Sequence, residues 1–525
     1  MNLPMQRQNL PIGIQSFRTL KEDNCYYVDK TALIEQLVRQ GRHYFLSRPR
    51  RFGKSLLLDT LRELFACNEP LFEGLHIHDR WDWDAPHPVV RFSFDGKYNE
   101  PGELARDILG QLEFIEEDAG IEPASNQMSS SLRLRRLLSR LHRTTGRQVV
   151  VLVDEYDKPI LDVLTNPELA TANRDHLRGF YGILKGCADH LRFVFVTGIS
   201  MFSKVSLFSG LNNLEDISVD PRFATICGYT DGDLDAVFAP ELEGLDRDEI
   251  RDWYNGYHWL GSENVYNPFD VLLLLRQRKF KPHWFETGSP TFLFEMMMEK
   301  GVGPLDVEKL AAEGSLVSTF DVGNIGVDAL MFQTGYLTIT GEQRRDDETL
   351  YRLDYPNKEV RLSVNSGLLH YVTGRGRETK EQSRSLCQLL VDNDFDGFKA
   401  HLQTLFAGIP YQWQTQPELA RYEAWYAGIL YACFRTIGVD LRVEESTSHG
   451  RSDMVLLRGG QVFALEFKMA GEGEDEAAAV GRAVRQIRER GYVEKYGERG
   501  EPIHLLGVVF GREARNVIAV GAERL

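Results

Sequence analysis

The chain has 525 residues, enough for about three domains of ordinary size, each able to bury its own core. It is 42% hydrophobic and 26% charged, which excludes a largely disordered chain because such chains lack the apolar area that offsets the entropy of ordering. The formal net charge of −16 disfavours a protein that coats nucleic acid with its whole surface, although a local basic groove can still bind phosphates.

Nothing in the sequence marks the chain for a membrane or for export. The apolar runs are shorter than a membrane span, and the first residues, MNLPMQRQNLPIG, lack the apolar region of a signal peptide. The six cysteines show no C-x-x-C spacing, which argues against a zinc knuckle and a disulfide framework; they are Cys25, Cys67, Cys187, Cys227, Cys387 and Cys433. We therefore expect a cytoplasmic protein without membrane contacts.

The first motif in chain order is "FLSRPRRFGKSLLL", residues 45–58. It ends as a phosphate-binding loop ends, but Arg48 stands where the pattern G-x-x-x-x-G-K-[ST] has its first glycine. "HYFLS" predicts a strand before the loop and "SLLLDTLRELF" a helix after it, which points the positive end of the helix at bound phosphates. Gly53 would allow close approach, Lys54 would reach the β- and γ-phosphates, and the Ser55 hydroxyl would ligate Mg²⁺. The remaining residues of the predicted nucleotide-binding loop are Arg50, Arg51 and Phe52.

A second basic cluster lies in "SLRLRRLLSRLHRTTGR", residues 131–147. Leucines recur at helical spacing between the arginines, so the segment predicts an amphipathic helix with a solvated basic face. A nucleic-acid contact on this face is the alternative.

The stretch "RQVVVLVDEYDKP" supplies the acidic motif that an ATPase of this type needs beside its loop. Residues 149–153 predict a buried parallel strand. Asp154 would then hold Mg²⁺ and Glu155 would orient or deprotonate water, while Asp157 is interpreted as a turn residue. The alternative is a core strand closed by an acidic turn.

A third strand is predicted in "LRFVFVTGIS", which ends in Thr197 and Ser200. Thr197 lies where related ATPases keep a polar residue that senses the γ-phosphate. A strand that leaves the core through a Thr-Gly turn explains the same residues equally well.

Several stretches resemble the bacterial AAA-ATPase-like family, whose members commonly carry a C-terminal nuclease-like domain of the PD-(D/E)XK superfamily. They are "LPIGIQSFRTLKEDNCYYVDKTALIEQL", "FLSRPRRFGKSLLLDTL", "VVVLVDEYDKPI", "VTGISMFSKVSLFSGLNNLEDIS", "WYNGYHW" with "VYNPFDVL", and "FQTGYLTI". In that family the sequence R-P-R-R-F-G-K-S stands where other phosphate-binding loops have their leading glycine. The resemblance therefore implies that an arginine at the position of Arg48 is usual in the family. It also implies ATP and Mg²⁺ as cofactors.

Between about 220 and 345 the sequence predicts short helices, interpreted as a helical lid or winged-helix-like region behind the P-loop core. His258, between Tyr257 and Trp259, is interpreted as a packed residue of an aromatic cluster rather than a catalyst. Arg222 is either an arginine finger or an ordinary surface residue.

A second set of chemically active residues lies in "VEESTSHGRSDMVLLRGGQVFALEFKM". Gly459 and Gly460 predict a tight hairpin between strands at about 452–458 and 461–468. Side chains alternate along a strand, so Glu466 and Lys468 share a face, and the antiparallel neighbour places Asp453 near them. Asp453 and Glu466 would hold Mg²⁺, and Lys468 would position the metal-activated water.

This pattern resembles the D…E-x-K core of PD-(D/E)XK nucleases. The resemblance implies that Glu423, in a preceding helix, completes the metal shell and that Gln486, in "AVRQIRERGY", is a further site residue. An E-x-K pair that is only a surface charge pair is the alternative.

These observations predict an α/β protein. We expect an AAA-like P-loop ATPase domain over 1–220, a helical, winged-helix-like lid over 221–370, and a PD-(D/E)XK nuclease-like α/β domain over 371–525. The favoured hypothesis is an ATPase whose nucleotide state controls a metal-dependent nuclease acting on DNA or RNA. The alternatives are a regulatory or scaffolding ATPase with an inactive nuclease fold, and an ATP-binding switch that hydrolyses slowly and forms homo-oligomers.

Overall fold

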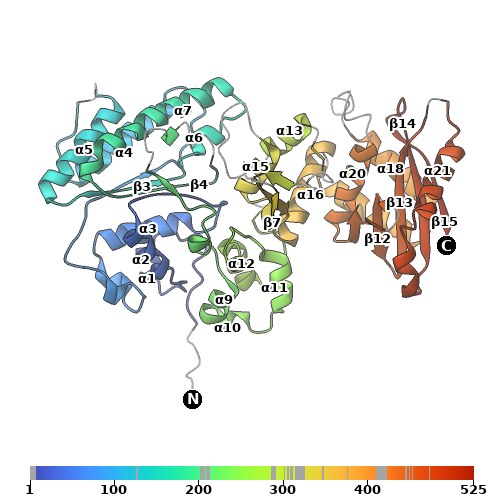
Figure 1. The fold of residues 1–525 in the computed structure, drawn as a ribbon, viewed down its shortest axis with the longest axis horizontal. Coiled ribbons are helices and arrows are strands. Elements are labelled where there is room, and N and C mark those ends of the chain that lie inside the picture. Colours follow the sequence, from blue (N-terminus) through green and yellow to red (C-terminus); the bar gives the residue numbers. More distant parts are fainter. Residues whose placement is uncertain are drawn as a thin grey trace, which may run out of the picture. The chain divides into compact units, whose positions relative to one another are not determined.

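The computed structural model describes residues 7–125, 128–201, 207–208, 213–284, 291–300, 302–303, 307, 311–313, 326–345, 348–374, 376–409, 423–443, 446–447, 450–451, 453–471 and 473–525. The chain forms two compact units (Figure 1). The N-terminal unit comprises residues 1–284 and 311–357, and the C-terminal unit comprises 285–310 and 358–525. The sheet and the helical region that follows it thus share one unit.

A five-stranded parallel sheet forms the centre of the N-terminal unit, in the order β2-β3-β4-β1-β5. Its strands are β1 (His43–Ser47), β2 (Val89–Ser93), β3 (Val149–Asp154), β4 (Leu191–Gly198) and β5 (Glu215–Asp216). β3 is buried along its whole length, as its unbroken apolar run predicts. The three predicted strands of this part are confirmed, and parallel pairing brings the segments after β1, β3 and β4 to one edge of the sheet.

Helices cover both faces of this sheet, with α1 to α3 on one side and α4, α5 and α7 on the other (Figure 1). They are α1 (Phe17–Glu22), α2 (Thr31–Gln40), α3 (Lys54–Phe65), α4 (Glu103–Asp118), α5 (Ser130–Thr145), α6 (Lys158–Leu161) and α7 (Pro167–Gly182). Short 3-10 helices are η1 (Glu69–Phe72), η2 (His78–Arg80), η3 (Ile183–His190) and η4 (Pro221–Phe223).

The basic helix predicted near residue 140 is α5, but Arg133 does not lie on a solvated face. Its side chain is buried, and its Nε and Nη2 donate to Glu116 Oε2 of α4 at 2.9 and 2.7 Å. Arg136 also approaches Glu116, with Nη1 3.4 Å from Oε1. The expectation for Arg133 was wrong because a buried carboxylate on the neighbouring helix, invisible in the local pattern, requires a cation.

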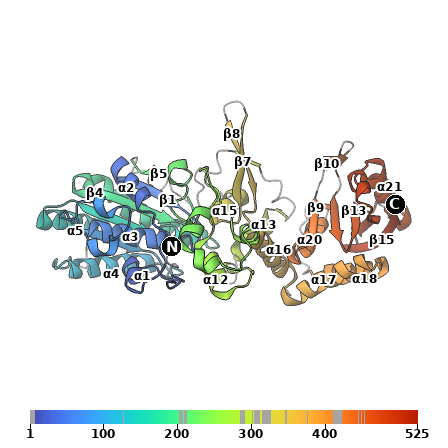
Figure 2. The same ribbon diagram turned by 90° about the horizontal axis from the view of Figure 1, so that it is seen from below.

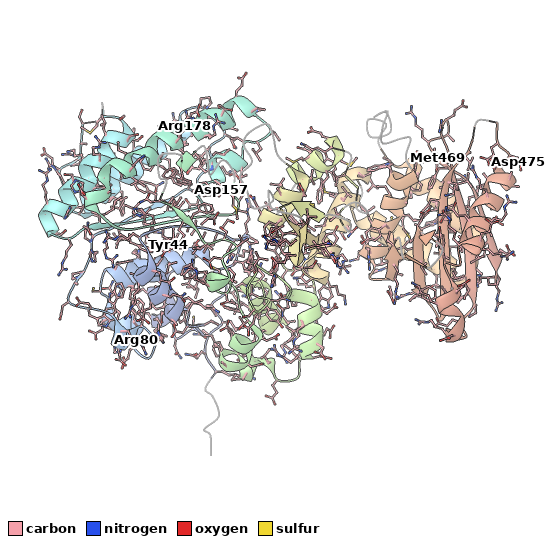
Figure 3. All side chains as sticks on the ribbon, in the orientation of Figure 1. Tyr44, Arg80, Asp157, Arg178, Met469 and Asp475 are labelled. Carbon is pink, nitrogen blue, oxygen red and sulfur yellow. The ribbon has the colours of Figure 1, made fainter. Side chains whose placement is uncertain are left out.

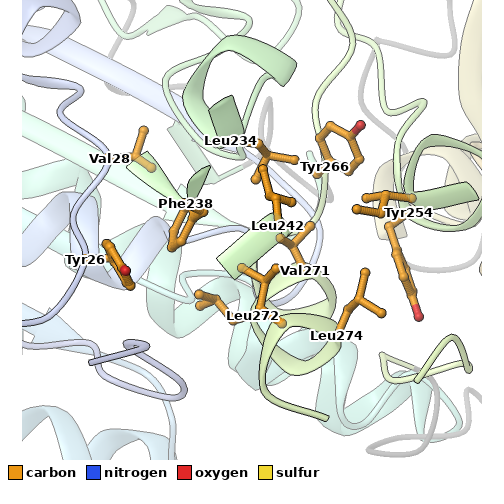
Figure 4. Close-up of a cluster of buried hydrophobic side chains, with 12 residues drawn as sticks. Tyr26, Val28, Leu234, Phe238, Leu242, Tyr254, Tyr266, Val271, Leu272 and Leu274 are labelled. Carbon is orange, nitrogen blue, oxygen red and sulfur yellow. The ribbon is translucent and has the colours of Figure 1, made fainter. Parts of the chain in front are cut away.

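The region after the sheet is helical, with α9 (Asp231–Val237), α10 (Ala239–Leu242), α11 (Arg247–Tyr254) and α12 (Pro268–Gln277). Its core includes Tyr26 and Val28 from the N-terminal segment beside Leu234, Phe238 and other apolar side chains (Figure 4). The segment before the phosphate loop therefore helps to form the core of the helical region.

An antiparallel sheet completes the N-terminal unit, in the order β6-β8-β7. Its strands are β6 (Ala311–Glu313), β7 (Thr338–Arg345) and β8 (Glu348–Asp354), and the helix α15 (Val327–Thr334) precedes β7. β7 and β8 run side by side as a long hairpin (Figure 2).

The C-terminal unit combines helices with a mixed sheet in the order β15-β14-β13-β12-β9, in which the β13 and β14 pair is parallel and the other pairs are antiparallel. The strands are β9 (Asp440–Val443), β12 (Met454–Arg458), β13 (Gln461–Met469), β14 (Ile503–Gly511) and β15 (Asn516–Arg524), with β10 (Ser446–Thr447) and β11 (Gly450–Arg451) as a separate pair. The helices are α13 (Thr291–Glu299), α16 (Lys358–Thr373), α17 (Gly376–Val391), α18 (Phe395–Ala407), α20 (Glu423–Thr436), α21 (Glu476–Glu489) and the 3-10 helix η8 (Glu494–Arg499).

The predicted hairpin is confirmed as β12 and β13, which pair from Met454–Leu465 to Arg458–Gln461. Gly459 and Gly460 have φ of +61° and +68°, values that a two-residue turn of this hand requires and that favour glycine. β13 ends at Met469, and Asp475 caps the start of α21 (Figure 3). α21 packs on β13, β14 and β15.

Across the described part of the chain, no helix is both long enough and apolar enough to span a membrane.

Candidate nucleotide and nuclease sites

The segment between β1 and α3 folds as a loop closed by its own lysine. Lys54, the first residue of α3, is only 6% exposed, and its Nζ donates to the carbonyl oxygens of Arg48 and Pro49, each at 2.9 Å. Burial lowers the pKa of Lys54, and the charges of Asp154 and Glu155 oppose that shift. The ammonium group thus lies inside a turn of backbone at the N-terminus of a helix, the place where anions bind.

The other side chains of the loop differ in their surroundings. Arg48 and Phe52 are buried, and the guanidinium carbon of Arg51 lies 3.8 Å from the centroid of the Phe269 ring. Arg50 is exposed and Ser55 is partly exposed in the first turn of α3. The Phe52 side chain is therefore packed within the protein, whereas those of Arg50 and Arg51 are exposed.

The acidic motif ends β3, two strands from β1 in the sheet. The Asp154 carboxylate is buried, and it accepts a hydrogen bond from Thr197 Oγ1 at 3.0 Å, while Arg91 Nη2 lies 3.5 Å from its second oxygen. Glu155 follows with φ of +54°, and burial raises the pKa of its carboxyl while Lys54 opposes the shift. The structure thus brings Lys54, Asp154, Glu155 and Thr197 to one edge of the sheet.

Asp157 has a structural task larger than that of a turn residue. It is fully buried, and its carboxylate accepts hydrogen bonds from Ile199 N at 3.1 Å, Ser200 N at 2.7 Å and Ser200 Oγ at 2.6 Å. Figure 3 labels Asp157 within the N-terminal unit. Asp157 therefore ties the segment after β3 to the segment after β4, and the Ser200 hydroxyl is already used.

Two further residues of the sequence analysis are engaged within the chain. Arg222 bonds to Asp220, to Glu215 Oε1 at 2.8 Å and to Gln40 Oε1 at 3.0 Å. The Nε2 atom of His258 is 3.0 Å from the carbonyl oxygen of Gly261, in keeping with a packed histidine. Arg91 was missed by sequence reasoning, although an arginine in the apolar strand "VVRFS" is the signal that could have drawn attention to it.

The second site lies on the β12 and β13 hairpin. Glu466 is fully buried, and Lys468 Nζ donates to its Oε1 at 2.9 Å. Asp453, one residue before β12, accepts a hydrogen bond from Phe467 N at 2.9 Å. Because 466 and 468 alternate with 467 along the strand, both side chains share the face that the Asp453 carboxylate approaches.

The helix α21 adds Gln486, whose Nε2 donates to Glu466 Oε1 and lies 3.5 Å from the Tyr492 hydroxyl. Arg490 Nη1 in turn donates to that hydroxyl at 3.3 Å. Sequence reasoning did not single out Arg490; its signal is a cation two residues before a tyrosine that follows the helix. Glu423 is the first residue of α20, and its side chain lies outside the described residues.

The donor set of this site fits a divalent cation. Burial raises the pKa of Glu466 to about 7, Asp453 adds to the shift and Lys468 opposes it. Glu466 Oε2 is buried without a hydrogen-bond partner among the described residues. A hard cation between two carboxylates would satisfy that oxygen. Over the same residues, no group of three or more His, Cys, Asp or Glu side chains gathers as a metal site.

The fold and these two sites define a class of protein with a P-loop NTPase core and a nuclease-like mixed-sheet domain. Residues 11–208 match the family described as "Predicted AAA-ATPase", and residues 421–520 match the PD-(D/E)XK nuclease superfamily. The chain is 51% identical over 523 residues to an uncharacterized protein in the vnfD 5′ region of Azotobacter chroococcum mcd 1, covering 99% of this chain and 100% of that protein. The chain belongs to the AAA-ATPase-like family with a C-terminal PD-(D/E)XK domain.

Among solved structures, the crystal structure of Cdc6p from Pyrobaculum aerophilum is similar at 14% sequence identity, with a TM-score of 0.25. The match covers 70% of this chain and 96% of that chain.

Proposed function

We propose that the chain binds and hydrolyses ATP, and that its nucleotide state controls a Mg²⁺-dependent nuclease in the C-terminal unit that acts on DNA or RNA. The observation that carries the nuclease assignment is Glu466, a buried carboxylate whose Oε2 has no partner among the described residues, beside Asp453 and Lys468. The arrangement has the carboxylates and the cation that metal-assisted phosphodiester hydrolysis needs.

At the nucleotide site, each residue has a distinct task. Lys54 would exchange its bonds to the loop carbonyls for bonds to the β- and γ-phosphates, and Ser55 and Asp154 would hold Mg²⁺. Thr197 orients the Asp154 carboxylate through its hydroxyl. Glu155 would accept a proton from the attacking water, a task that suits a carboxyl whose pKa is raised.

At the nuclease site, Asp453 and Glu466 would hold Mg²⁺, which when bound supplies an activated water and offsets charge on the phosphate. Lys468 donates a hydrogen bond to Glu466 and would position the water and stabilise the developing negative charge. Gln486 donates to Glu466 and would keep that carboxylate in place.

The test is incubation of the full chain with labelled single- and double-stranded DNA and RNA, with Mg²⁺ or Mn²⁺, with and without ATP. We expect cleavage of at least one substrate, loss of cleavage on adding a chelator, and a rate that depends on ATP. Phosphate release measured in parallel reports the ATPase. Absence of cleavage under every condition would favour the scaffold with an inactive nuclease fold.

A matched pair of variants separates the two sites. Lys54→Ala removes the charge that meets the phosphates and should abolish tight ATP binding in calorimetry. Unchanged ATP affinity in Lys54→Ala would refute the assignment of the loop. Asp453→Asn should abolish cleavage and leave ATP binding unchanged.

A further inference from the structure

The phosphate loop is held by segments that follow the parallel sheet in the chain. Arg48 is fully buried, and its Nη1 donates to the carbonyl oxygens of Ser218 at 2.6 Å and Ser47 at 2.9 Å. Its Nη2 donates to the carbonyl oxygen of Phe223 at 3.3 Å. The guanidinium carbon lies 4.1 Å from the centroid of the Trp259 ring.

This burial is costly for a charged group. Burial lowers the pKa of Arg48 to about 10, and the charges of Cys227 and Asp216 oppose that shift. Backbone carbonyls and an aromatic face contact the guanidinium directly and help to compensate its charge. The two terminal nitrogens of the guanidinium make these hydrogen bonds, while the buried Nε has no partner among the described residues. A lysine has a single nitrogen and cannot reproduce this fork.

Neighbouring residues of the loop contact the same segments. The Phe52 ring packs edge-on against Tyr257 at 4.8 Å and Trp259 at 5.3 Å between centroids, and Gly228 N donates to Phe52 O at 3.2 Å. Arg48 and Phe52 are therefore fixed by contacts with residues 218–228 and 257–259, and Lys54 holds the carbonyl oxygens of Arg48 and Pro49.

Pro49 meets a further segment of the N-terminal unit. At Gly335 a Cβ atom would lie 2.5 Å from Pro49 Cγ, and the glycine has φ of +87°. This close approach places the turn between α15 and β7 directly against the start of the loop.

We propose that Arg48 is a positioning residue of the nucleotide site: its guanidinium fixes the start of the loop, so that the carbonyls of Arg48 and Pro49 face Lys54. This inference rests on the proposed ATP function. It explains how the loop does without its leading glycine, because the anchor lies in the body of the protein instead of in a flexible turn. It also links nucleotide occupancy to residues 218–228 and to Trp259.

The inference makes a prediction opposite to that of the sequence pattern. Arg48→Gly restores the usual loop motif, yet it removes the anchor and should weaken ATP binding by about tenfold or more, since the loop must then be ordered by the ligand. Arg48→Lys keeps the charge and should stay defective, because the charge does not face the phosphates. Trp259→Phe keeps an aromatic face and should bind nearly as wild type, whereas Trp259→Ala should lose affinity.

The experiment measures ATP affinity of the full chain by calorimetry, with circular dichroism and the thermal midpoint as checks of folding. Arg39→Ala, on an exposed helix end, is the control and should leave affinity unchanged. The double variant of Arg48→Gly and Trp259→Ala should lose less affinity than the two single losses combined, because both single variants remove the Arg48–Trp259 contact and Trp259→Ala also removes the contact with Phe52. Fully additive losses would show that Arg48 and Trp259 act independently.

The outcomes separate the two proposals. ATP binding in wild type that is lost in Lys54→Ala and kept in Arg48→Gly would overturn the role of Arg48 and leave the ATP site intact. Rescue by Arg48→Lys would also overturn it, since charge alone would then suffice. No ATP binding in wild type would overturn both.

Discussion

At the scale of single residues, Lys468 distinguishes an enzyme from a scaffold. Its Nζ bonds to Glu466 at 2.9 Å, so it lies beside the buried carboxylate that would hold the metal. Lys468→Ala should lower cleavage on the order of a hundredfold, the usual effect of deleting one preorganised transition-state contact. Affinity for nucleic acid should change little. The slope of the logarithm of the binding constant against the logarithm of the salt concentration should become shallower by about one unit, because one cation is lost.

The measurement compares single-turnover cleavage with binding at several salt concentrations. A variant that cleaves as fast as wild type would show that the site lies elsewhere. Lys495→Ala, on the 3-10 helix after the site strand, serves as a control for the loss of one cation.

Glu155 offers a second residue-scale prediction. Glu155→Gln keeps the shape of the side chain and loses the base, so it should leave ATP affinity within a fewfold of wild type and slow phosphate release. The two properties are measured by calorimetry and by a phosphate assay on the same preparation. If release is unchanged, Glu155 is a turn residue and another group activates water.

Residue types could be predicted from the sequence where the chemistry is local. Lys54, Asp154 and Glu466 follow from short motifs that name both the residue and its element. The burial of the Arg48 side chain against Ser218 could not be predicted, because Ser218 is 170 residues away in the chain. Asp157 lies in a turn as expected, but the hydrogen bonds of its carboxylate could not be predicted, since their donors lie 42 and 43 residues further on.

At the scale of elements, a buried ion pair joins α4 and α5. Arg133→Met leaves the Glu116 carboxylate buried without its main partner, which should destabilise the N-terminal unit by about 3–5 kcal/mol. The pair Arg133→Met with Glu116→Gln should recover part of that loss. Chemical denaturation followed by circular dichroism measures both, and an equal loss in single and double variants would contradict a charge effect.

The turn between α15 and β7 contacts the phosphate loop through Gly335 and Pro49, and a substitution at Gly335 tests whether this contact affects ATP binding. Gly335→Ala strains a backbone with φ of +87° and pushes against Pro49, so it should weaken ATP binding as well as stability. Gly341→Ala in β7 is the matched control, because a Cβ there meets nothing within 4 Å. Calorimetry of both variants checks the prediction, and equal affinities would show that the contact does not set the loop.

Elements could be predicted where the apolar pattern and the turn residues agree. The run of valines gave β3, and the paired glycines gave the β12 and β13 hairpin. The parallel pairing of β13 with β14 could not be predicted, since the two strands are joined through α21 and share no local signal. The order of the five parallel strands could not be predicted either, because strands that are distant in the sequence carry no local signal of which neighbour they pair with.

At the scale of the whole molecule, the proposed control of cleavage by ATP is a statement about coupled equilibria between the two units. If ATP changes the affinity for nucleic acid by some factor, nucleic acid must change the affinity for ATP by the same factor, because binding free energies form a closed cycle. A chain that carries Glu155→Gln and Asp453→Asn should neither hydrolyse ATP nor cleave nucleic acid, so both affinities can be measured at equilibrium. We expect two equal factors on the order of five or more, as is typical of coupled sites.

Adding Lys54→Ala should remove the effect of ATP and keep the binding of nucleic acid. If neither ligand changes the affinity for the other, the two units act independently. The proposal that nucleotide state controls the nuclease would then be wrong even if each site is active.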